Sequence, residues 1–152
     1  MKISGTSLVA MPRDRAYSLL QDPAVLARCM PGCEGLEKIG ENEYAMHMKM
    51  VLAAVSGKFE GKVRITDASP PEQFRLHVDG AGKIGFMKGD GLLKLTEADG
   101  GTDVAYEGEV NVGGTIASVG QRLIDSTAKM LIKRFFDKLA AESTRASAGS
   151  TD

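Results

Sequence analysis

Few residues in this chain have the type and spacing that enzyme chemistry requires. The segment Gly80-Ala-Gly-Lys-Ile-Gly85 matches the dinucleotide-binding pattern G-x-G-x-x-G. That chemistry needs a strand before the motif and a helix after it, so that backbone amides point at a pyrophosphate. The residues that follow, 86–95, alternate as a further strand would. We therefore interpret the motif as a glycine-rich hairpin at the mouth of a cavity.

Histidine and tyrosine are the other candidates for acid-base chemistry. His47 and His77 fall on strand faces that also carry charged residues, so we expect both to be solvated. Tyr44 and Tyr106 are expected to point inward, where a hydroxyl could bind a ligand carbonyl or reach the surface. No inward carboxylate or Ser-His-Asp arrangement emerges. We therefore predict no catalytic residue and a protein that is not an enzyme.

The only two cysteines, Cys29 and Cys33, have no further cysteine or nearby histidine to complete a zinc site. We expect reduced thiols in a cytoplasmic protein, with no metal and no covalently bound cofactor. With 19 basic and 20 acidic residues, the formal charge of −1 argues against nucleic-acid binding. No segment approaches the roughly 20 apolar residues of a membrane span.

The positions of these residues depend on the elements that carry them. At 152 residues the length fits one domain. Ile3 to Val9 alternate like an edge strand, Pro12 to Leu20 form a short helix, and a second helix begins at Asp22-Pro23 and ends at Pro31-Gly32. From 34 to 112 the period is two, which predicts a meander of antiparallel strands with one buried face.

After Gly113-Gly114 the period changes to about 3.6, and apolar residues from Ile116 to Leu139 share one stripe. This pattern predicts one long helix that covers the sheet. Residues 143–152 are small and polar, so we predict a single domain over 1–142 and a disordered tail over 143–152. The fold class is α+β, with six to seven antiparallel strands.

Glycine recurs on the predicted inner face, where a core would normally carry Val or Ile. These glycines serve either as bulges and kinks in a curved sheet or as small residues that leave an apolar cavity beneath the helix. A methionine stripe allows the same two interpretations, core filling or repacking around an apolar ligand. The residues expected to face the cavity are Met46, Met48, Phe59, Phe74, Leu76, Phe86, Leu93, Tyr106, Gly120, Leu123, Thr127 and Leu131.

A cationic stripe lies roughly opposite the apolar face of the last helix. It comprises Arg122, Lys129 and Lys133, at spacings of seven and four residues. Either it is a solvated face or it docks to an acidic partner or to anionic lipid headgroups.

The order of strand, two short helices, meander and long helix is similar to the START-type helix-grip domains of the SRPBCC superfamily. Several segments more specifically resemble CoxG, an accessory family of carbon monoxide dehydrogenases, over residues 1 to about 140. These segments are Met30-Pro-Gly-Cys-Glu34, Ser56–Val63, Gly82–Gly91, Val112–Arg122 and Phe135-Phe136.

This resemblance implies a non-catalytic accessory of a molybdenum-containing carbon monoxide dehydrogenase or related hydroxylase, which links that enzyme to the cytoplasmic membrane. It also implies a hydrophobic ligand in the cavity, a quinone or a lipid-like molecule. Some members carry a C-terminal extension proposed as a membrane tether. This chain ends at Asp152 without one, so we expect peripheral contact. Two rivals remain, a polyketide cyclase or aromatase-like enzyme on the same fold and an assembly factor without a ligand.

Overall fold

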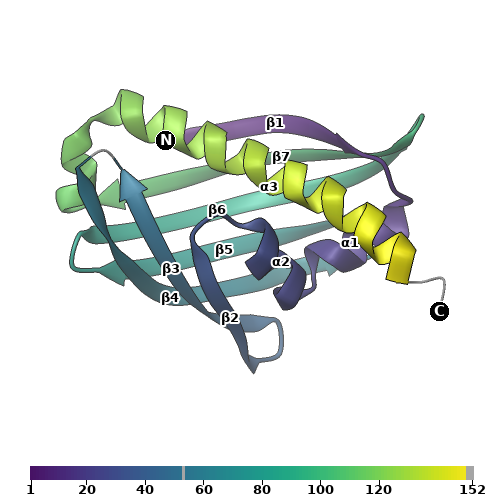
Figure 1. Ribbon diagram of the computed structural model, residues 1–152, viewed down its shortest axis with the longest axis horizontal. Coiled ribbons are helices and arrows are strands. Elements are labelled where there is room, and N and C mark those ends of the chain that lie inside the picture. The colour runs from purple at the N-terminus through teal and green to yellow at the C-terminus, as the bar shows by residue number, and fades with distance from the viewer. Residues whose placement is uncertain (53, 150–152) are drawn as a thin grey trace.

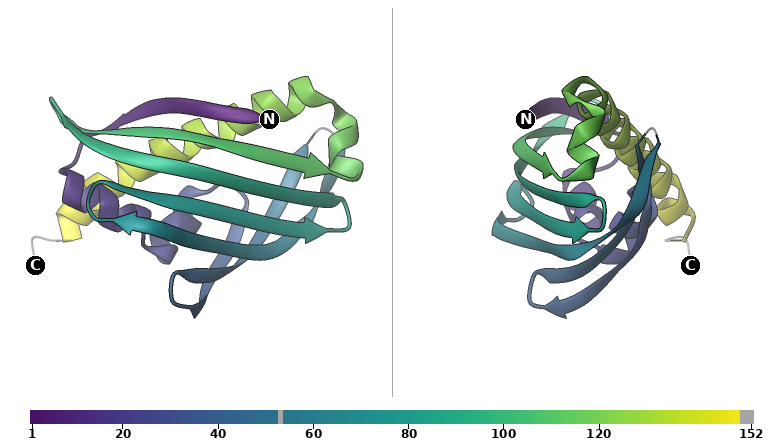
Figure 2. Two further views of the ribbon diagram at one scale, coloured as in Figure 1. Left: turned by 180° about the vertical axis from the view of Figure 1, so that it is seen from behind. Right: turned by 90° about the vertical axis from the view of Figure 1, so that its left-hand side faces the viewer.

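A seven-stranded antiparallel sheet curves around one long helix (Figure 1; Figure 2). The computed structural model describes residues 1–52 and 54–149. In space the strands follow the order β1-β7-β6-β5-β4-β3-β2, so consecutive strands from β2 to β7 pair as hairpins and β1 pairs with β7. The predicted α+β class, meander and number of strands are confirmed. Because the sheet stays open, β1 and β2 form its two edges.

The first strand and the two short helices agree with the sequence pattern. β1 is Lys2–Val9, α1 is Arg13–Leu20 and α2 is Pro23–Cys29. The Asp22 carboxylate caps α2 by accepting from the backbone N–H of Ala24 at 2.9 Å. The proline at the start of α2 has no N–H to leave unpaired, so it suits the first helical turn.

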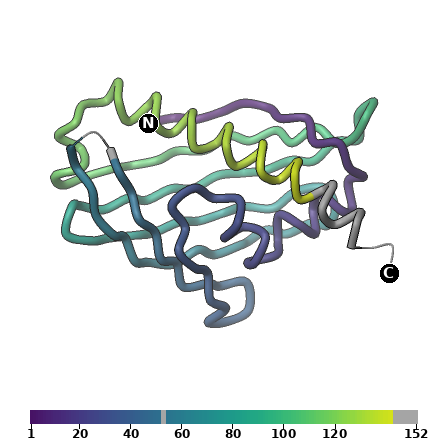
Figure 3. The backbone as a smooth tube through the Cα atoms, in the orientation of Figure 1, coloured from purple at the N-terminus to yellow at the C-terminus, as the bar shows by residue number. Residues whose placement is uncertain are grey.

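The remaining strands run back and forth along the length of the molecule, as the tube in Figure 3 shows. Inner-face residues alternate with exposed ones along each strand, because one face of the sheet is buried and the other meets water. The strands are β2 (Cys33–Gly40), β3 (Glu43–Leu52), β4 (Val55–Ser69), β5 (Gln73–Gly82), β6 (Gly85–Ala98) and β7 (Gly101–Gly113).

The C-terminal helix begins later than the sequence predicted. A short 3-10 helix, η1 (Thr115–Val119), precedes α3 (Gln121–Gly149). Gly114 and Gly120 have φ angles of 84° and 100°, in the left-handed region that breaks a right-handed helix. One continuous helix from Ile116 was therefore a wrong prediction. The predicted tail over 143–152 overlaps the last residues of α3, which continues to Gly149, and residues 150–152 lie outside the described part of the chain.

The core is concentrated at one end of the sheet and around β3 and β4. There α3 around Phe135 and Leu139, together with α1 and α2, closes over the concave face (Figure 1). Tyr17 and Phe74 meet edge to face with ring centroids 5.5 Å apart. Phe59 and Leu139 are fully buried. This end of the molecule is therefore filled by its own side chains.

Candidate functional site: the open half of the concave face

The concave face is less well covered toward η1 and the start of α3. Leu76 and Leu123 point inward here but are only partly buried. The closest backbone approaches of α3 are to α2, η1, β1 and β3. This half of the grip is where a ligand could lie against the sheet.

Apart from Gly80, where an added Cβ would meet Met46 Cε at 3.0 Å, the predicted inner-face glycines fall into two groups. At Gly61, Gly82 and Gly108 an added Cβ would meet a neighbouring backbone oxygen at 1.8 to 2.3 Å, so close approach of the strands requires glycine there. At Gly89 and Gly91 an added Cβ would meet only atoms of β7, none nearer than 3.4 Å. No atom of α3 lies within 4 Å of either added Cβ. Close strand approach therefore explains the first group, and a cavity at Gly89 and Gly91 stays a prediction.

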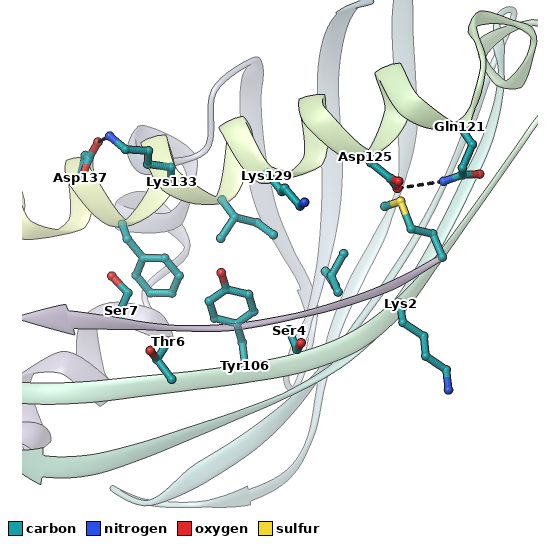
Figure 4. Close-up of a pocket in the computed structure, with 14 residues that line it drawn as sticks. Lys2, Ser4, Thr6, Ser7, Tyr106, Gln121, Asp125, Lys129, Lys133 and Asp137 are labelled. Carbon is teal, nitrogen blue, oxygen red and sulfur yellow. Dashed lines mark hydrogen bonds and ion pairs between the residues drawn. The ribbon is translucent and has the colours of Figure 1, made fainter.

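A pocket of about 730 Å³ lies between β1 and α3 (Figure 4). This volume is in the range of small-molecule sites. Fourteen residues line it: Met1, Lys2, Ile3, Ser4, Thr6, Ser7, Tyr106, Gln121, Asp125, Lys129, Ile132, Lys133, Phe136 and Asp137. Because β1 is an edge strand, the pocket opens at the side of the sheet, next to the open half of the concave face.

Tyr106 is the predicted cavity residue that also lines this pocket. Its ring stacks on Phe136, with centroids 5.7 Å apart and planes at 21°. Its hydroxyl lies over Gly5, the residue directly opposite on β1, where an added Cβ would stand 2.5 Å from the hydroxyl oxygen. Glycine at position 5 therefore leaves space for this tyrosine. The hydroxyl points toward α3 (Figure 4).

The other predicted cavity residues divide between core and open half. Met46, Met48, Phe59 and Phe74 are at most 5% exposed and belong to the core. Their methionine and aromatic pattern is explained by core filling. The partly buried residues are Leu76, Leu93, Leu123, Thr127 and Leu131.

Two predicted positions were wrong. Phe86 lies on the outward face, 44% exposed, because the inward residues of β6 are the odd-numbered ones that include Leu93 and Leu95. Its ring covers Gly113, directly opposite on β7. Gly120 lies between η1 and α3, with nothing within 4 Å of an added Cβ, so it does not press on the sheet.

The cationic stripe on α3 is also divided. Lys129 and Lys133 line the pocket, and Lys133 donates to Asp137 at 3.3 Å. Arg122 is exposed and is not a pocket residue. The use of these three residues as a partner surface stays a prediction.

The structure brings together one cluster of polar side chains that the sequence did not indicate. Thr66, His77 and Asp90 lie on neighbouring strands, with Thr66 Oγ1 2.8 Å from His77 Nε2 and Asp90 in contact with His77 Nδ1. The order resembles a nucleophile, base and orienting acid. It lies on the outward face, as predicted for His77, and none of its residues lines the pocket. We interpret it as a cross-strand hydrogen-bond chain.

Other reactive groups are placed unfavourably for chemistry. Burial raises the pKa of the Cys29 thiol and of the Cys33 thiol above the usual value, so both stay protonated near neutral pH. Among the described residues, no three His, Cys, Asp or Glu side chains gather as a metal site would require. Within the same residues, no helix combines the length and apolar character needed to cross a membrane.

This sheet and its long helix have the helix-grip fold of START-type domains. A "START superfamily protein" from Mycobacterium smegmatis has the same fold, with a TM-score of 0.75 at 11% identity over 95% of this chain and 98% of that one. The profile of CoxG, a family of subunits named for carbon monoxide dehydrogenase, matches residues 5–143. The chain therefore belongs to the CoxG family.

Other solved structures are similar over nearly the whole chain. A "conserved protein from Geobacillus kaustophilus" is 35% identical, with a TM-score of 0.91 over 96% of this chain and 97% of that one. One half of "the di-domain ARO/CYC StfQ from the steffimycin biosynthetic pathway" has the same fold, with a TM-score of 0.68 at 12% identity over 97% of this chain and 51% of that one. A comparison with curated protein sequences gave no match.

Proposed function

We propose that this protein is a carrier of a hydrophobic ligand, a quinone or a lipid-like molecule, that serves a carbon monoxide dehydrogenase-type molybdenum enzyme. The observation that carries the proposal is the uncovered inner surface at Gly89 and Gly91, where no atom of α3 lies within 4 Å of an added Cβ. Burial of an apolar molecule on this surface would stabilise the complex by about 25 cal/mol per Å² of apolar area removed from water. The partner enzyme is inferred from the name of the family.

The proposal assigns binding rather than catalysis to the site. The buried thiols are protonated, and His77 lies on the outward face of the sheet. The similarity to an aromatase and cyclase extends to the fold alone. Tyr106 remains the residue through which an enzyme of this fold could act, and it tests the rival hypothesis. A Tyr106→Phe variant that retained ligand uptake but lost a measured turnover would favour the enzyme.

A larger side chain in the open half of the concave face tests the carrier hypothesis directly. Substitution of Gly91 or Gly89 by Leu should lower the affinity for decylubiquinone by at least about tenfold, because the new side chain takes the place of the ligand. Neither substitution should reduce stability, since a strand interior prefers a larger side chain to glycine. Equilibrium dialysis and thermal unfolding measure the two effects.

Gly35→Leu is the matched control. Gly35 pairs with His47 on the outward side of β2, and nothing lies within 4 Å of an added Cβ there. It should leave ligand affinity unchanged. A folded Gly91→Leu protein that bound decylubiquinone as tightly as the parent would contradict the carrier hypothesis.

Contact with an anionic membrane is a second part of the proposal, favoured by the end of the sheet near η1. Val51 and Phe86 are 65% and 44% exposed there, on the outward face. Lys49 lies directly opposite Lys58, although like charges on facing strands repel. Exposed apolar residues beside lysines are typical of proteins that bind anionic lipid surfaces from the cytoplasm. Membrane contact through this surface would bring the open half of the concave face close to a ligand in the membrane.

A further inference from the structure

The pocket between β1 and α3 contains more hydrogen-bond donors than its own acceptors use. Asp125 accepts from the Gln121 amide at 3.0 Å, and Asp137 accepts from Lys133 at 3.3 Å. Both acidic groups of the pocket therefore have partners on α3 (Figure 4). The pocket contains three lysines against these two aspartates, so its net charge is positive although the chain as a whole carries −1.

Lys129 and Tyr106 are among the donors that line this pocket without a partner on the protein. In the described part of the chain, the Lys129 ammonium has no ion pair and the Tyr106 hydroxyl has no hydrogen bond, while their neighbour Lys133 is paired. Lys129 extends from α3 over the pocket, and the Tyr106 hydroxyl points up from β7 toward the helix (Figure 4). An ammonium group can only donate hydrogen bonds. The pocket is therefore complementary to a group that accepts them.

Apolar surface continues from these donors onto the concave face of the sheet. Ile132 and Phe136 of α3 line the pocket above Tyr106, and Phe136 stacks on the tyrosine ring. On the sheet, Gly108 lies between Ile3 of β1 and Gly91 of β6 in the pairing register. An apolar chain that begins at Tyr106 thus meets small residues and the uncovered surface at Gly91.

We propose that the β1–α3 pocket binds the polar end of the ligand and selects an acceptor, a carbonyl or a carboxylate, through Tyr106 and Lys129. The apolar remainder then extends past Gly108 onto the open half of the concave face. This inference rests on the proposed carrier function. It adds the chemistry of the head group and the direction in which the ligand enters.

A series of sixteen-carbon probes that differ in the head group tests the selection. Displacement of Nile red would be measured for hexadecanoate, 2-hexadecanone and hexadecylamine below their micellar concentrations. We expect the two acceptor probes to bind at least about tenfold tighter than the amine, because the cationic amine is repelled by Lys129 and cannot accept hydrogen bonds from Lys129 or from the Tyr106 hydroxyl.

Two variants show whether Lys129 and Tyr106 each bind the carboxylate, the ketone or both. Lys129→Met should weaken hexadecanoate by about tenfold or more and leave the ketone within about threefold, because only the carboxylate forms a charge-assisted bond with the ammonium. Tyr106→Phe keeps the ring stack and should weaken both acceptor probes by about three- to tenfold. Lys138→Met, an exposed lysine of α3 that does not line the pocket, is the control and should change neither affinity.

The outcomes distinguish this inference from the proposed function. Equal affinity for all three probes, or acceptor affinities unchanged in both Lys129→Met and Tyr106→Phe, would overturn the head-group selection while the carrier function stands. If the parent protein bound none of the probes and no decylubiquinone, the carrier function itself would be wrong. Circular dichroism of each variant verifies that the fold is retained.

Discussion

At the scale of single residues, the site depends on glycines, which have no side chain, as much as on larger residues. Gly5 leaves space for the Tyr106 hydroxyl, and Gly91 leaves the concave face uncovered. Thr102, by contrast, is fully buried and donates its hydroxyl to the Met11 carbonyl at 2.8 Å. Its hydrogen-bonding capacity is used within the core. The unpaired polar groups discussed above lie instead in the pocket.

Cys29 provides a residue-scale prediction about pH. Burial raises the pKa of this thiol in the folded state, so above about pH 9 the unfolded chain loses the proton while the folded chain keeps it. The free energy of unfolding therefore falls as pH rises from the unfolded pKa toward the folded one. Cys29→Ala removes this contribution. Between pH 8 and about pH 10.5, urea titrations should show a smaller loss of stability in the variant.

Because lysines and tyrosines also titrate in this range, the difference between the two proteins is the relevant quantity. Parallel pH profiles for parent and variant would show that the thiol contributes nothing. At pH 7 the variant should be less stable by about 1 kcal/mol, because a fully buried sulfur is lost.

At the scale of elements, α3 is fastened to the rest of the fold near the end of its described part. Arg28 of α2 donates to both carboxylate oxygens of Glu142, from Nε at 2.8 Å and from Nη2 at 3.0 Å. Leu139 is fully buried one turn earlier. The first half of α3 instead borders the pocket and follows Gly120.

Removal of the Arg28–Glu142 pair should therefore loosen α3. Glu142→Gln should lower the melting temperature and speed amide hydrogen exchange in α3, because a bidentate partner of the guanidinium is lost. Asp137→Asn, which breaks the exposed Lys133–Asp137 pair, is the control and should have a much smaller effect. Equal exchange rates in both variants would show that the Arg28–Glu142 pair does not fasten the helix.

At the scale of the whole molecule, the two ends of the grip differ in their packing. One end is filled by α1, α2 and the α3 residues Phe135 and Leu139. The other end combines the uncovered concave face, the lateral pocket and the outward apolar residues Val51 and Phe86. Ligand entry and membrane contact would therefore take place at the same end.

Vesicle binding tests the membrane contact. Val51→Glu and Phe86→Glu should each reduce partitioning onto phosphatidylglycerol vesicles by about tenfold, because a charge replaces an exposed apolar side chain near the lipid. Leu8→Glu is the control, since Leu8 is 55% exposed at the other end of the sheet. Binding of the parent should weaken in high salt and on neutral phosphatidylcholine. Co-sedimentation equal in all three variants would exclude this surface.

The sequence alone determined the elements and their order, because hydrophobic periodicity is a local property. Alternation over residues 34–112 predicted the meander, and Asp22-Pro23 marked the start of α2. The inward side of β6 was predicted correctly from Leu93 and wrongly from Phe86. A phenylalanine normally indicates a core, and only the strand register shows that it covers Gly113 outside.

Tertiary structure alone decided the site. The pocket unites β1, at the start of the chain, with β7 and α3 near its end, and its shape depends on where the edge strand lies relative to the helix. Periodicity cannot tell a glycine that neighbouring backbone requires, such as Gly61, from one with open space above it, such as Gly91. Likewise Thr66, His77 and Asp90 meet only through cross-strand pairing. Distances between non-neighbouring segments are set by packing, which no local pattern contains.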